Sequence, residues 1–513
     1  GRGSANKTET EVEAMPWEDE EDKTGTFVPS DSGRKVYIRT FGCQMNERDS
    51  EVIAGMLIEK GYEIVDAADK ADVILFNTCS VRQHAEDRVA GNLRQLASRK
   101  KKDPGLRIGV LGCMAKRHGE NMFRDFPQVD MVVGPGNMFE IPDLVPKIYG
   151  SEKILAVKND KLPRKKVSTG YMQEGSFSAY VNIMSGCDNF CSYCIVPYVR
   201  GREVSRSVGE IVSEIKYLAD RGVKEVTLLG QNVNSYGKGL SSRKTFPDLL
   251  EAVNGIKGLK RVRFTTSHPK DADKSLFRAM RDLEKVCEYL HLPLQAGSDK
   301  ILDLMNRKYT YCEYRKKIDL LRSMMPDAGL STDIIVGFPS EKNADYRATR
   351  KALEEIQYNS AFIFKYSPRT PSFAATLVDD VTDEIKKKRN NELLEIQKEI
   401  SSAKNRAMIG TEQEVLVEGR SRMSQDEVVG KTRNNTSCVF RGGEDLVGSA
   451  VRVLVRDASS FTLKAEMVSA GLFPSGEQYT VICPGGAGLK ARQRRRRHRR
   501  ARVKRAARRY SAV

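Results

Sequence analysis

Long apolar runs, a secretory signal and a dense set of cysteines are all missing from this chain of 513 residues. No apolar stretch approaches the ~18 residues that a membrane-spanning helix requires, so no membrane partner is expected. The acidic segment ETEVEAMPWEDEED near the start contains no apolar core of the kind found in signal peptides. Ten cysteines are too few for a disulfide scaffold, which indicates a reducing, cytoplasmic location. There, cysteines are expected as metal ligands, nucleophiles or core thiols.

The positive charge of the chain is concentrated at its C-terminal end. The formal net charge is +18, and the segment 490–513 carries thirteen Lys and Arg and no acidic residue, so the rest carries only +5. Such a tail would bind nucleic acid through phosphates if it is native. A disordered tail or a translated vector extension is the alternative, and the opening GRGS is typical of a cloning scar. Charge alone therefore does not indicate a nucleic-acid-binding protein.

Three ordered parts are expected between a disordered leader at 1–33 and a basic tail at 470–513. Short β-branched runs alternate with helical segments over 34–150, which predicts a parallel α/β domain. A second α/β series over 172–404 contains six strand candidates, fewer than the eight of a closed barrel, and predicts a partial (β/α)6 barrel. Residues 408–469 alternate apolar with polar residues in short strands and predict a small all-β barrel.

Three cysteines are clustered in SGCDNFCSYCIVP, at Cys187, Cys191 and Cys194. This loop follows the first strand candidate of the second α/β series, where the active site of a barrel-like sheet forms. A zinc site needs four protein ligands, but there is no second CxxC pair, and His268 and His291 are distant in sequence. Zinc and plain buried thiols remain alternatives. The favoured interpretation is a three-thiolate 4Fe–4S cluster with one iron left open for a substrate.

Three further cysteines, Cys43, Cys79 and Cys113, look unrelated in sequence, but each directly follows a strand candidate. Ligands of parallel α/β sheets gather at the carboxyl ends of the strands, so these thiols are expected to converge in space. Independent core cysteines are the alternative, because cysteine is often buried. The pattern favours a second open three-cysteine cluster.

These motifs resemble those of the radical S-adenosylmethionine (SAM) superfamily, and within it the methylthiotransferase family. The segments TFGCQMNERDS, NTCSVRQHAEDR and GCMAKR are similar to its N-terminal domain. CQMN, CSYCIVPYVRGRE, VTLLGQNVNSYG and HLPLQAGS with MNRKYT resemble the MiaB type, which acts on isopentenyladenosine in tRNA. The C-terminal β-rich part is similar to a TRAM domain, an RNA-binding module. The resemblance extends from Arg34 to Val468.

The resemblance implies two 4Fe–4S clusters and SAM as cofactors. Cys187, Cys191 and Cys194 match the ligands of the radical-SAM cluster, whose open iron would bind SAM for cleavage to a 5′-deoxyadenosyl radical. The auxiliary cluster would be held by the other set, Cys43, Cys79 and Cys113. The implied enzyme uses two SAM per turnover to insert sulfur and a methyl group at carbon 2 of N6-isopentenyladenosine beside the anticodon of tRNA. A reducing donor such as flavodoxin and a monomeric state are also expected.

Further contacts to SAM or the adenine are expected near the strand ends of the barrel, although a role in loop structure is the alternative for each. These candidates are Tyr193, Gly230, Gln231, Ser267, Gln295 and Ser298. Arg200 and Arg202 in VRGRE are expected either to contact phosphate or the SAM carboxylate, or to be solvated.

The chain departs from the usual family strings in three loops. It reads QAGS for QSGS, GFPSEK for GFPGET, and RTPS where RPGT is usual, which leaves the fine substrate contacts open. Related family types act on threonylcarbamoyl-adenosine in tRNA or on an aspartate of a ribosomal protein. A non-catalytic iron–sulfur protein that binds RNA is the alternative from another class.

Overall fold

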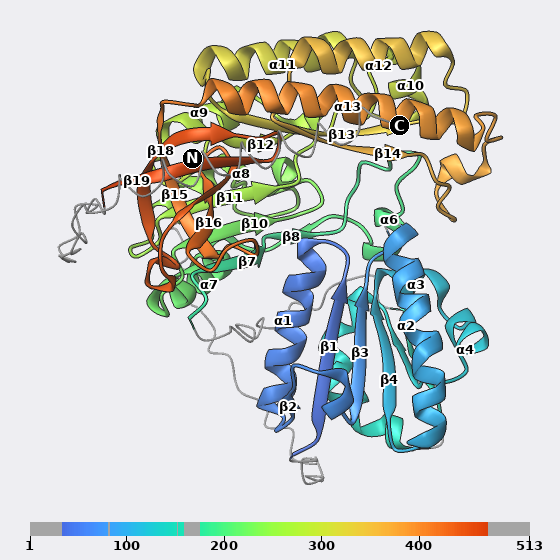
Figure 1. Cartoon of the computed structure of the whole chain (residues 1–513). Coiled ribbons are helices and arrows are strands. Elements are labelled where there is room, and N and C mark those ends of the chain that lie inside the picture. Colours follow the sequence, from blue (N-terminus) through green and yellow to red (C-terminus); the bar gives the residue numbers. More distant parts are fainter. Residues whose placement is uncertain (1–32, 81–82, 151, 159–174, 470–513) are drawn as a thin grey trace, which may run out of the picture.

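The computed structural model describes residues 33–80, 83–150, 152–158 and 175–469, which form three successive parts (Figure 1). The expected leader at 1–33, residue 33 excepted, and the expected tail at 470–513 lie outside the described residues. No helix of the described residues is both long enough and apolar enough to cross a membrane.

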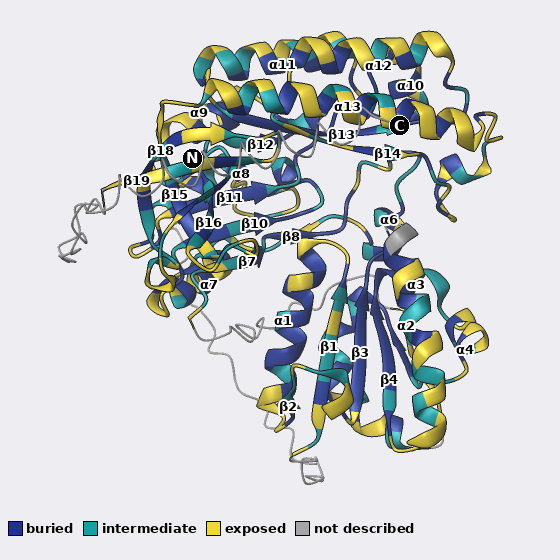
Figure 2. Ribbon diagram, in the orientation of Figure 1, coloured by how far each residue is buried: buried dark blue, intermediate teal, exposed yellow. Residues whose placement is uncertain are grey.

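The N-terminal part is a parallel six-stranded sheet with strand order β2-β1-β3-β4-β5-β6. Its strands are β1 (Lys35–Phe41), β2 (Glu63–Ile64), β3 (Val73–Thr78), β4 (Arg107–Gly112), β5 (Met131–Val133) and β6 (Ile154–Ala156). Its helices are α1 (Gln44–Glu59), α2 (Gln83–Lys102), α3 (Cys113–His118), α4 (Asn121–Asp125) and α5 (Ile141–Leu144), with 3-10 turns η1 (Ala68–Lys70), η2 (Pro135–Glu140) and η3 (Pro146–Tyr149). Every residue of β3 is buried, as a strand covered on both faces requires (Figure 2).

The central part contains six parallel strands in two sheets, β7-β10-β11 and β12-β13-β14, and a bridge between Val262 and Val286 links them. The strands are β7 (Ser178–Asn182), β10 (Glu225–Leu229), β11 (Arg261–Thr265), β12 (Tyr289–His291), β13 (Gly329–Val336) and β14 (Ser360–Lys365). A short antiparallel pair, β8 (Met184–Ser185) and β9 (Val204–Ser205), flanks the cysteine loop. This arrangement confirms the predicted partial barrel.

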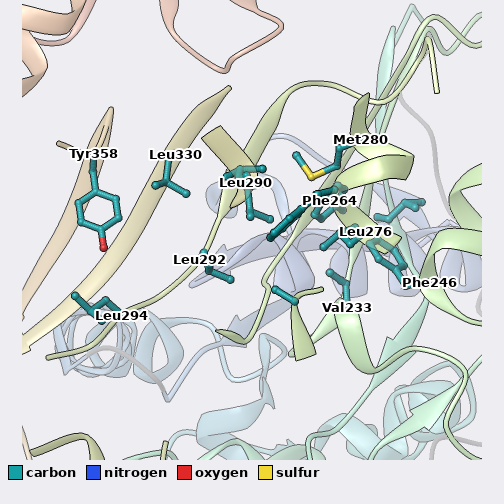
Figure 3. Close-up of a cluster of buried hydrophobic side chains, with 14 of the residues drawn as sticks. Val233, Phe246, Phe264, Leu276, Met280, Leu290, Leu292, Leu294, Leu330 and Tyr358 are labelled. Carbon is teal, nitrogen blue, oxygen red and sulfur yellow. The ribbon is translucent and has the colours of Figure 1, made fainter. Parts of the chain in front are cut away.

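Helices cover the outside of the partial barrel. They are α7 (Val208–Asp220), α8 (Phe246–Asn254), α9 (Lys274–Asp282), α10 (Asp299–Leu304), α11 (Tyr311–Met324), α12 (Asn343–Ile356) and α13 (Asp383–Ala407), with turns η4 (Val233–Ser235), η5 (Pro269–Asp271) and η6 (Phe373–Thr376). The short helix α6 (Val196–Arg200) lies instead against α3 of the N-terminal part. Ser207 and Glu210 form a capping box that starts α7, and Thr310 and Glu313 start α11 in the same way. The apolar faces of helices and strands meet in one core, where Phe246 and Phe264 pack edge to face at 5.1 Å (Figure 3).

The C-terminal part is a closed five-stranded barrel of order β15-β16-β17-β19-β18, as predicted. Its elements are β15 (Glu412–Arg420), β16 (Glu427–Thr432), β17 (Ser437–Arg441), η7 (Glu444–Leu446), β18 (Ala450–Ala458) and β19 (Thr462–Ser469). It docks at the amino ends of the central strands through Arg261, which begins β11 and is only 1% exposed. The Arg261 guanidinium donates to the Glu414 carboxylate at 2.7 Å and to the carbonyl of Lys431 at 2.8 Å.

Candidate active site

The N-terminal cysteines gather at one edge of the first sheet. Strands β1, β3 and β4 are neighbours, and Phe41, Thr78 and Gly112 share one register position at their carboxyl ends. Cys79 and Cys113 follow their strands directly, and Cys43 follows one residue later as the N-cap of α1. The sheet register therefore brings together three thiols that are more than thirty residues apart along the chain.

A glycine and two buried asparagines shape the edge that carries these thiols. Gly42 has a φ of +139°, and a Cβ there would lie 2.2 Å from the Cβ of Cys79, so only glycine allows the two loops to approach. The Asn46 amide donates to Asn77 Oδ1 at 3.1 Å and to the Thr78 carbonyl at 3.2 Å. Asn46 and Asn77 were not predicted as site residues, although they lie in the motifs CQMN and NTC.

The thiols of this set interact with one another. A hydrogen bond with Cys79 is the largest cause that lowers the pKa of Cys43 to about 6, and the positive charge of Arg200 acts in the same direction. Burial raises the pKa of Cys113, an effect that the positive charge of Arg200 opposes. Cys43 is accessible, whereas Cys79 and Cys113 are buried.

The loop of Cys187, Cys191 and Cys194 lies at the carboxyl end of the first barrel strand. Cys194 N–H donates to the Cys191 carbonyl at 2.9 Å, which closes a tight turn, and Cys187 N–H donates to the Gly201 carbonyl at 3.2 Å. A Cβ on Gly186, whose φ is +75°, would lie 2.1 Å from the carbonyl oxygen of Arg202. Burial raises the pKa of Cys187 to about 11 and that of Cys194 to about 12. Without a metal these two thiols stay protonated at neutral pH. A bound metal favours their deprotonation, because it binds cysteine as the thiolate.

Arg307 supports this loop from the segment that follows α10. It is 3% exposed and donates to Cys191 Sγ and to Tyr193 Oη, each at 3.2 Å. A further bond at 3.0 Å reaches the Pro293 carbonyl. This cation fixes both a thiol and the candidate Tyr193. The sequence signal for Arg307 was the quoted string MNRKYT, in which no residue was singled out.

Arg200 is not solvated, which was one of the two alternatives expected for it. Its side chain is 6% exposed and pairs with Asp49 of α1 at 2.7 Å. Asp49 also accepts from Asn182 Nδ2 at 3.3 Å. Arg202 is 73% exposed and pairs with Asp188 at 2.7 Å. The VRGRE motif thus contains a buried cation at the domain interface, Arg200, and a cation at the surface, Arg202.

The two cysteine sets approach each other through helix α6. Cys113 forms a small buried cluster with Ile195 and Val199, and Ile195 directly follows Cys194. Helices α3 and α6 are in contact here, and Figure 1 shows α6 above the carboxyl ends of β3 and β4. Both sets therefore lie on the sides of the two domains that face each other.

A second group of contacts joins the domains beside Cys79. Glu86 is 6% exposed and accepts two bonds from Arg117, at 2.9 and 3.0 Å, and one from Ser80. Arg369, from the RTPS segment of the barrel, lies 4.0 Å from the same carboxylate. The loop with the unusual RTPS string is thus part of the domain interface.

Buried polar atoms without a protein partner mark the carboxyl ends of the barrel strands. Ser267 Oγ, Gln295 Oε1 and Gln231 Oε1 are buried and have no hydrogen-bond partner among the described residues. An unpaired buried polar atom costs about 1–3 kcal/mol, and binding a polar ligand removes that cost. These atoms therefore fit a polar cofactor such as SAM. The amide of Gln231 also donates to Met45 Sδ of α1, so this side chain lies at the domain interface.

The other predicted contacts differ in what their side chains do. Ser298 donates its hydroxyl to Asp345 Oδ1 at 2.7 Å, which engages it in loop structure. Gly230 lies where a Cβ would come within 2.6 Å of the Met184 side chain, so it permits close packing behind the cysteine loop. Tyr193 lies against the barrel core with its hydroxyl on Arg307.

His268 is a candidate that the sequence analysis did not assign to this site. Its Nδ1 accepts from the Lys270 amide at 3.2 Å, so the proton lies on Nε2, which is buried without a partner. Burial and nearby positive charge hold its pKa well below the ordinary value. A neutral imidazole next to Ser267 can thus donate to a ligand at the strand ends. Its only sequence signal was its place after a strand candidate.

Within the described parts of the chain, no three His, Cys, Asp or Glu side chains converge closely enough to bind a single metal ion. A 4Fe–4S cluster makes a different demand, because each thiolate binds its own iron. Two sets of three free thiols at facing strand ends are a donor set of that chemistry. The residues therefore fit clusters better than a zinc ion.

Comparison with known families divides the chain in the same order. Residues 35–134 match the "Uncharacterized protein family UPF0004", residues 181–353 the "Radical SAM superfamily", and residues 406–468 the "TRAM domain". The "tRNA-2-methylthio-N(6)-dimethylallyladenosine synthase" of Clostridium beijerinckii is 45% identical over 87% of this chain and 98% of its own. That of Moorella thermoacetica is 46% identical over 85% of this chain and 99% of its own.

The chain belongs to the tRNA-2-methylthio-N(6)-dimethylallyladenosine synthase family. Its radical SAM domain implies a 4Fe–4S cluster and SAM as cofactors. Its TRAM domain is an RNA-binding module. Among solved structures, the radical SAM methyltransferase TsrM from Kitasatospora setae is 12% identical, with a TM-score of 0.48 over 64% of this chain and 72% of that one.

Proposed function

We propose that this protein inserts sulfur and a methyl group at carbon 2 of N6-isopentenyladenosine beside the anticodon of tRNA, with two SAM consumed per turnover. The observation that carries the proposal is the pair of three-cysteine sets at facing strand ends, joined by the buried cluster of Cys113, Ile195 and Val199. The identity with named synthases over most of both chains supports the substrate. We further propose functional units at 34–150, 172–404 and 408–469.

Each set would hold one cluster. Cys187, Cys191 and Cys194 would bind the radical-SAM cluster. An auxiliary cluster would be bound by the three thiols of the first sheet, Cys43, Cys79 and Cys113. When bound, the clusters and SAM would supply radical cleavage of a C–H bond and the sulfur that is transferred, chemistry that side chains alone cannot provide.

The residues of the chain bind, orient and shield the reacting groups. Ser267, Gln295 and His268 would donate to or accept from SAM with the polar atoms that have no protein partner. Arg307 holds Cys191 and Tyr193 in place. The buried ion pair of Arg48 with Glu214, at 2.7 Å and with each side chain at most 5% exposed, fixes the two domains against each other. A fixed domain arrangement would keep both cysteine sets directed toward one base.

The remaining expectations concern partners. The TRAM barrel docks rigidly to the catalytic part through Arg261 and would bind the tRNA backbone. A reducing donor such as flavodoxin would supply electrons to a monomeric enzyme in the cytoplasm. These points stay predictions, and each is open to direct measurement.

Mass spectrometry of nucleosides tests the proposal. Full-length protein with reconstituted clusters is incubated with SAM, dithionite and tRNA that carries isopentenyladenosine, and with tRNA that carries threonylcarbamoyl-adenosine. The expected result is a mass gain equal to one methylthio group on isopentenyladenosine alone. A gain on the other nucleoside, or on neither, would refute the substrate. If the reconstituted protein does not cleave SAM, the alternative of a non-catalytic iron–sulfur protein that binds RNA would hold.

A further inference from the structure

Arg200 is unusual because its backbone belongs to one cysteine loop and its side chain to the other. It ends α6, and the carbonyl of the next residue, Gly201, accepts from Cys187 N–H at 3.2 Å. Its guanidinium crosses the domain interface and pairs with Asp49 at 2.7 Å, and Val199, the residue before it, lies in a small buried cluster with Cys113. The barrel part therefore supplies a cation to the cysteine set of the N-terminal part.

Burial makes this charge effective. The Arg200 side chain is 6% exposed and that of Asp49 is 8% exposed, so water screens neither strongly. Among the described residues, Asp49 and the thiols of Cys113 and Cys43 are the groups whose charge acts most strongly on Arg200. In the absence of strong screening, a cation next to cysteine ligands favours negative charge on whatever those ligands hold.

We propose that Arg200 is a positioning residue that completes the auxiliary cluster site from the barrel side and raises the reduction potential of the cluster bound there. The inference rests on the proposed function, because it needs a cluster on Cys43, Cys79 and Cys113. Reduction adds one electron to the cluster, supplied by an external chemical reductant, and a nearby cation stabilises the more negative product. Net charge and hydrogen bonds to sulfur are established determinants of such potentials.

A redox titration of the auxiliary cluster alone tests the proposal. The full chain with Cys187, Cys191 and Cys194 all replaced by Ala is reconstituted and titrated by electron paramagnetic resonance. About four irons are expected, and their absence would refute the proposed auxiliary cluster itself, not the role of Arg200. In this background Arg200→Gln should lower the reduction equilibrium constant about tenfold, which is 59 mV for a one-electron couple. Arg200→Lys, which keeps the charge, should stay within threefold.

Two further variants separate charge from structure. Asp49→Asn breaks the same ion pair but removes a negative charge, so it should shift the potential in the opposite direction, upward. Arg350→Gln, on the outer face of α12 and 45% exposed, should leave the potential unchanged. A downward shift in Asp49→Asn would show that only the ion pair matters and would overturn the proposal. An unchanged potential in Arg200→Gln at full iron content would overturn it as well. If Arg200→Gln binds no iron, the direction found with Asp49→Asn decides.

Discussion

Cys113 of the first sheet shares a small buried cluster with Ile195, the residue that follows Cys194 of the barrel loop. This cluster joins the segment of one cysteine set to the segment of the other. The helix that starts at Val196 then carries Arg200 into the first domain. A single short segment thus links the two proposed clusters, which gives the site a geometry that can be tested by local changes.

Glycine substitutions should remove the two clusters one at a time. Gly42→Ala would force a Cβ to 2.2 Å from Cys79, and Gly186→Ala would force one to 2.1 Å from the carbonyl of Arg202. Each variant should retain about four irons instead of about eight, by iron analysis of reconstituted protein. SAM cleavage should survive only in Gly42→Ala.

Gly239→Ala is the matched control for this pair. Gly239 also has a positive φ, +81°, but no atom lies within 4 Å of the position of its Cβ. It carries backbone strain alone and should keep about eight irons. Loss of iron in this control to the same extent would mean that strain, and not the clash beside a cysteine, explains the two variants.

Ser267→Ala should separate stability from cofactor affinity. The hydroxyl is buried without a partner, so its removal should leave the melting temperature of SAM-free protein unchanged or higher. If the hydroxyl binds SAM, the dissociation constant should rise about tenfold, which corresponds to about 1.4 kcal/mol. Calorimetry measures both quantities.

Ser331→Ala serves as the control for the buried hydroxyl. Ser331 Oγ lies 2.6 Å from Tyr289 Oη and 2.8 Å from His291 Nδ1, so its loss should lower stability without a change in SAM affinity. An unchanged SAM affinity in Ser267→Ala would remove this residue from the cofactor site.

Arg48→Met should uncouple the two halves of the reaction. The substitution leaves Arg206 as the remaining arginine partner of buried Glu214. Breaking a buried ion pair costs about 3–5 kcal/mol, and this cost would fall on the free energy of docking between the domains. SAM cleavage by the barrel should persist, whereas methylthiolated nucleoside should fall at least tenfold. Proportional loss of both activities would contradict a role in domain docking.

Arg261→Ala should loosen the C-terminal barrel. Its guanidinium is buried and binds Glu414 and the Lys431 carbonyl, so its removal leaves those acceptors without their donor. Limited proteolysis should then release the fragment that begins near residue 408, and tRNA affinity should fall. Arg456→Ala, on an exposed pair with Glu466, tests whether charge loss alone weakens tRNA binding. Equal weakening in both variants would count against rigid docking.

The sequence predicted the fold class well because each part has a strong local signal. The burial of every residue of β3 and the capping boxes of α7 and α11 follow from apolar runs and S/T-x-x-E patterns that can be read residue by residue. The convergence of Cys43, Cys79 and Cys113 also follows, since parallel strands end at one edge.

Only the tertiary structure decided which side chains cross between the parts. Arg200 was expected at a phosphate, at SAM or in solvent; its burial excludes solvent, and its pairing with Asp49 of α1 depends on the packing of the domains. Arg48 and Arg261, which no motif singled out, each form a buried interdomain contact. The physical reason is that spacing along the chain determines which residues share a loop or a face, whereas the partner of that face depends on how whole domains pack. The sequence by itself determined both cysteine sets, and packing determined that they face each other across α6.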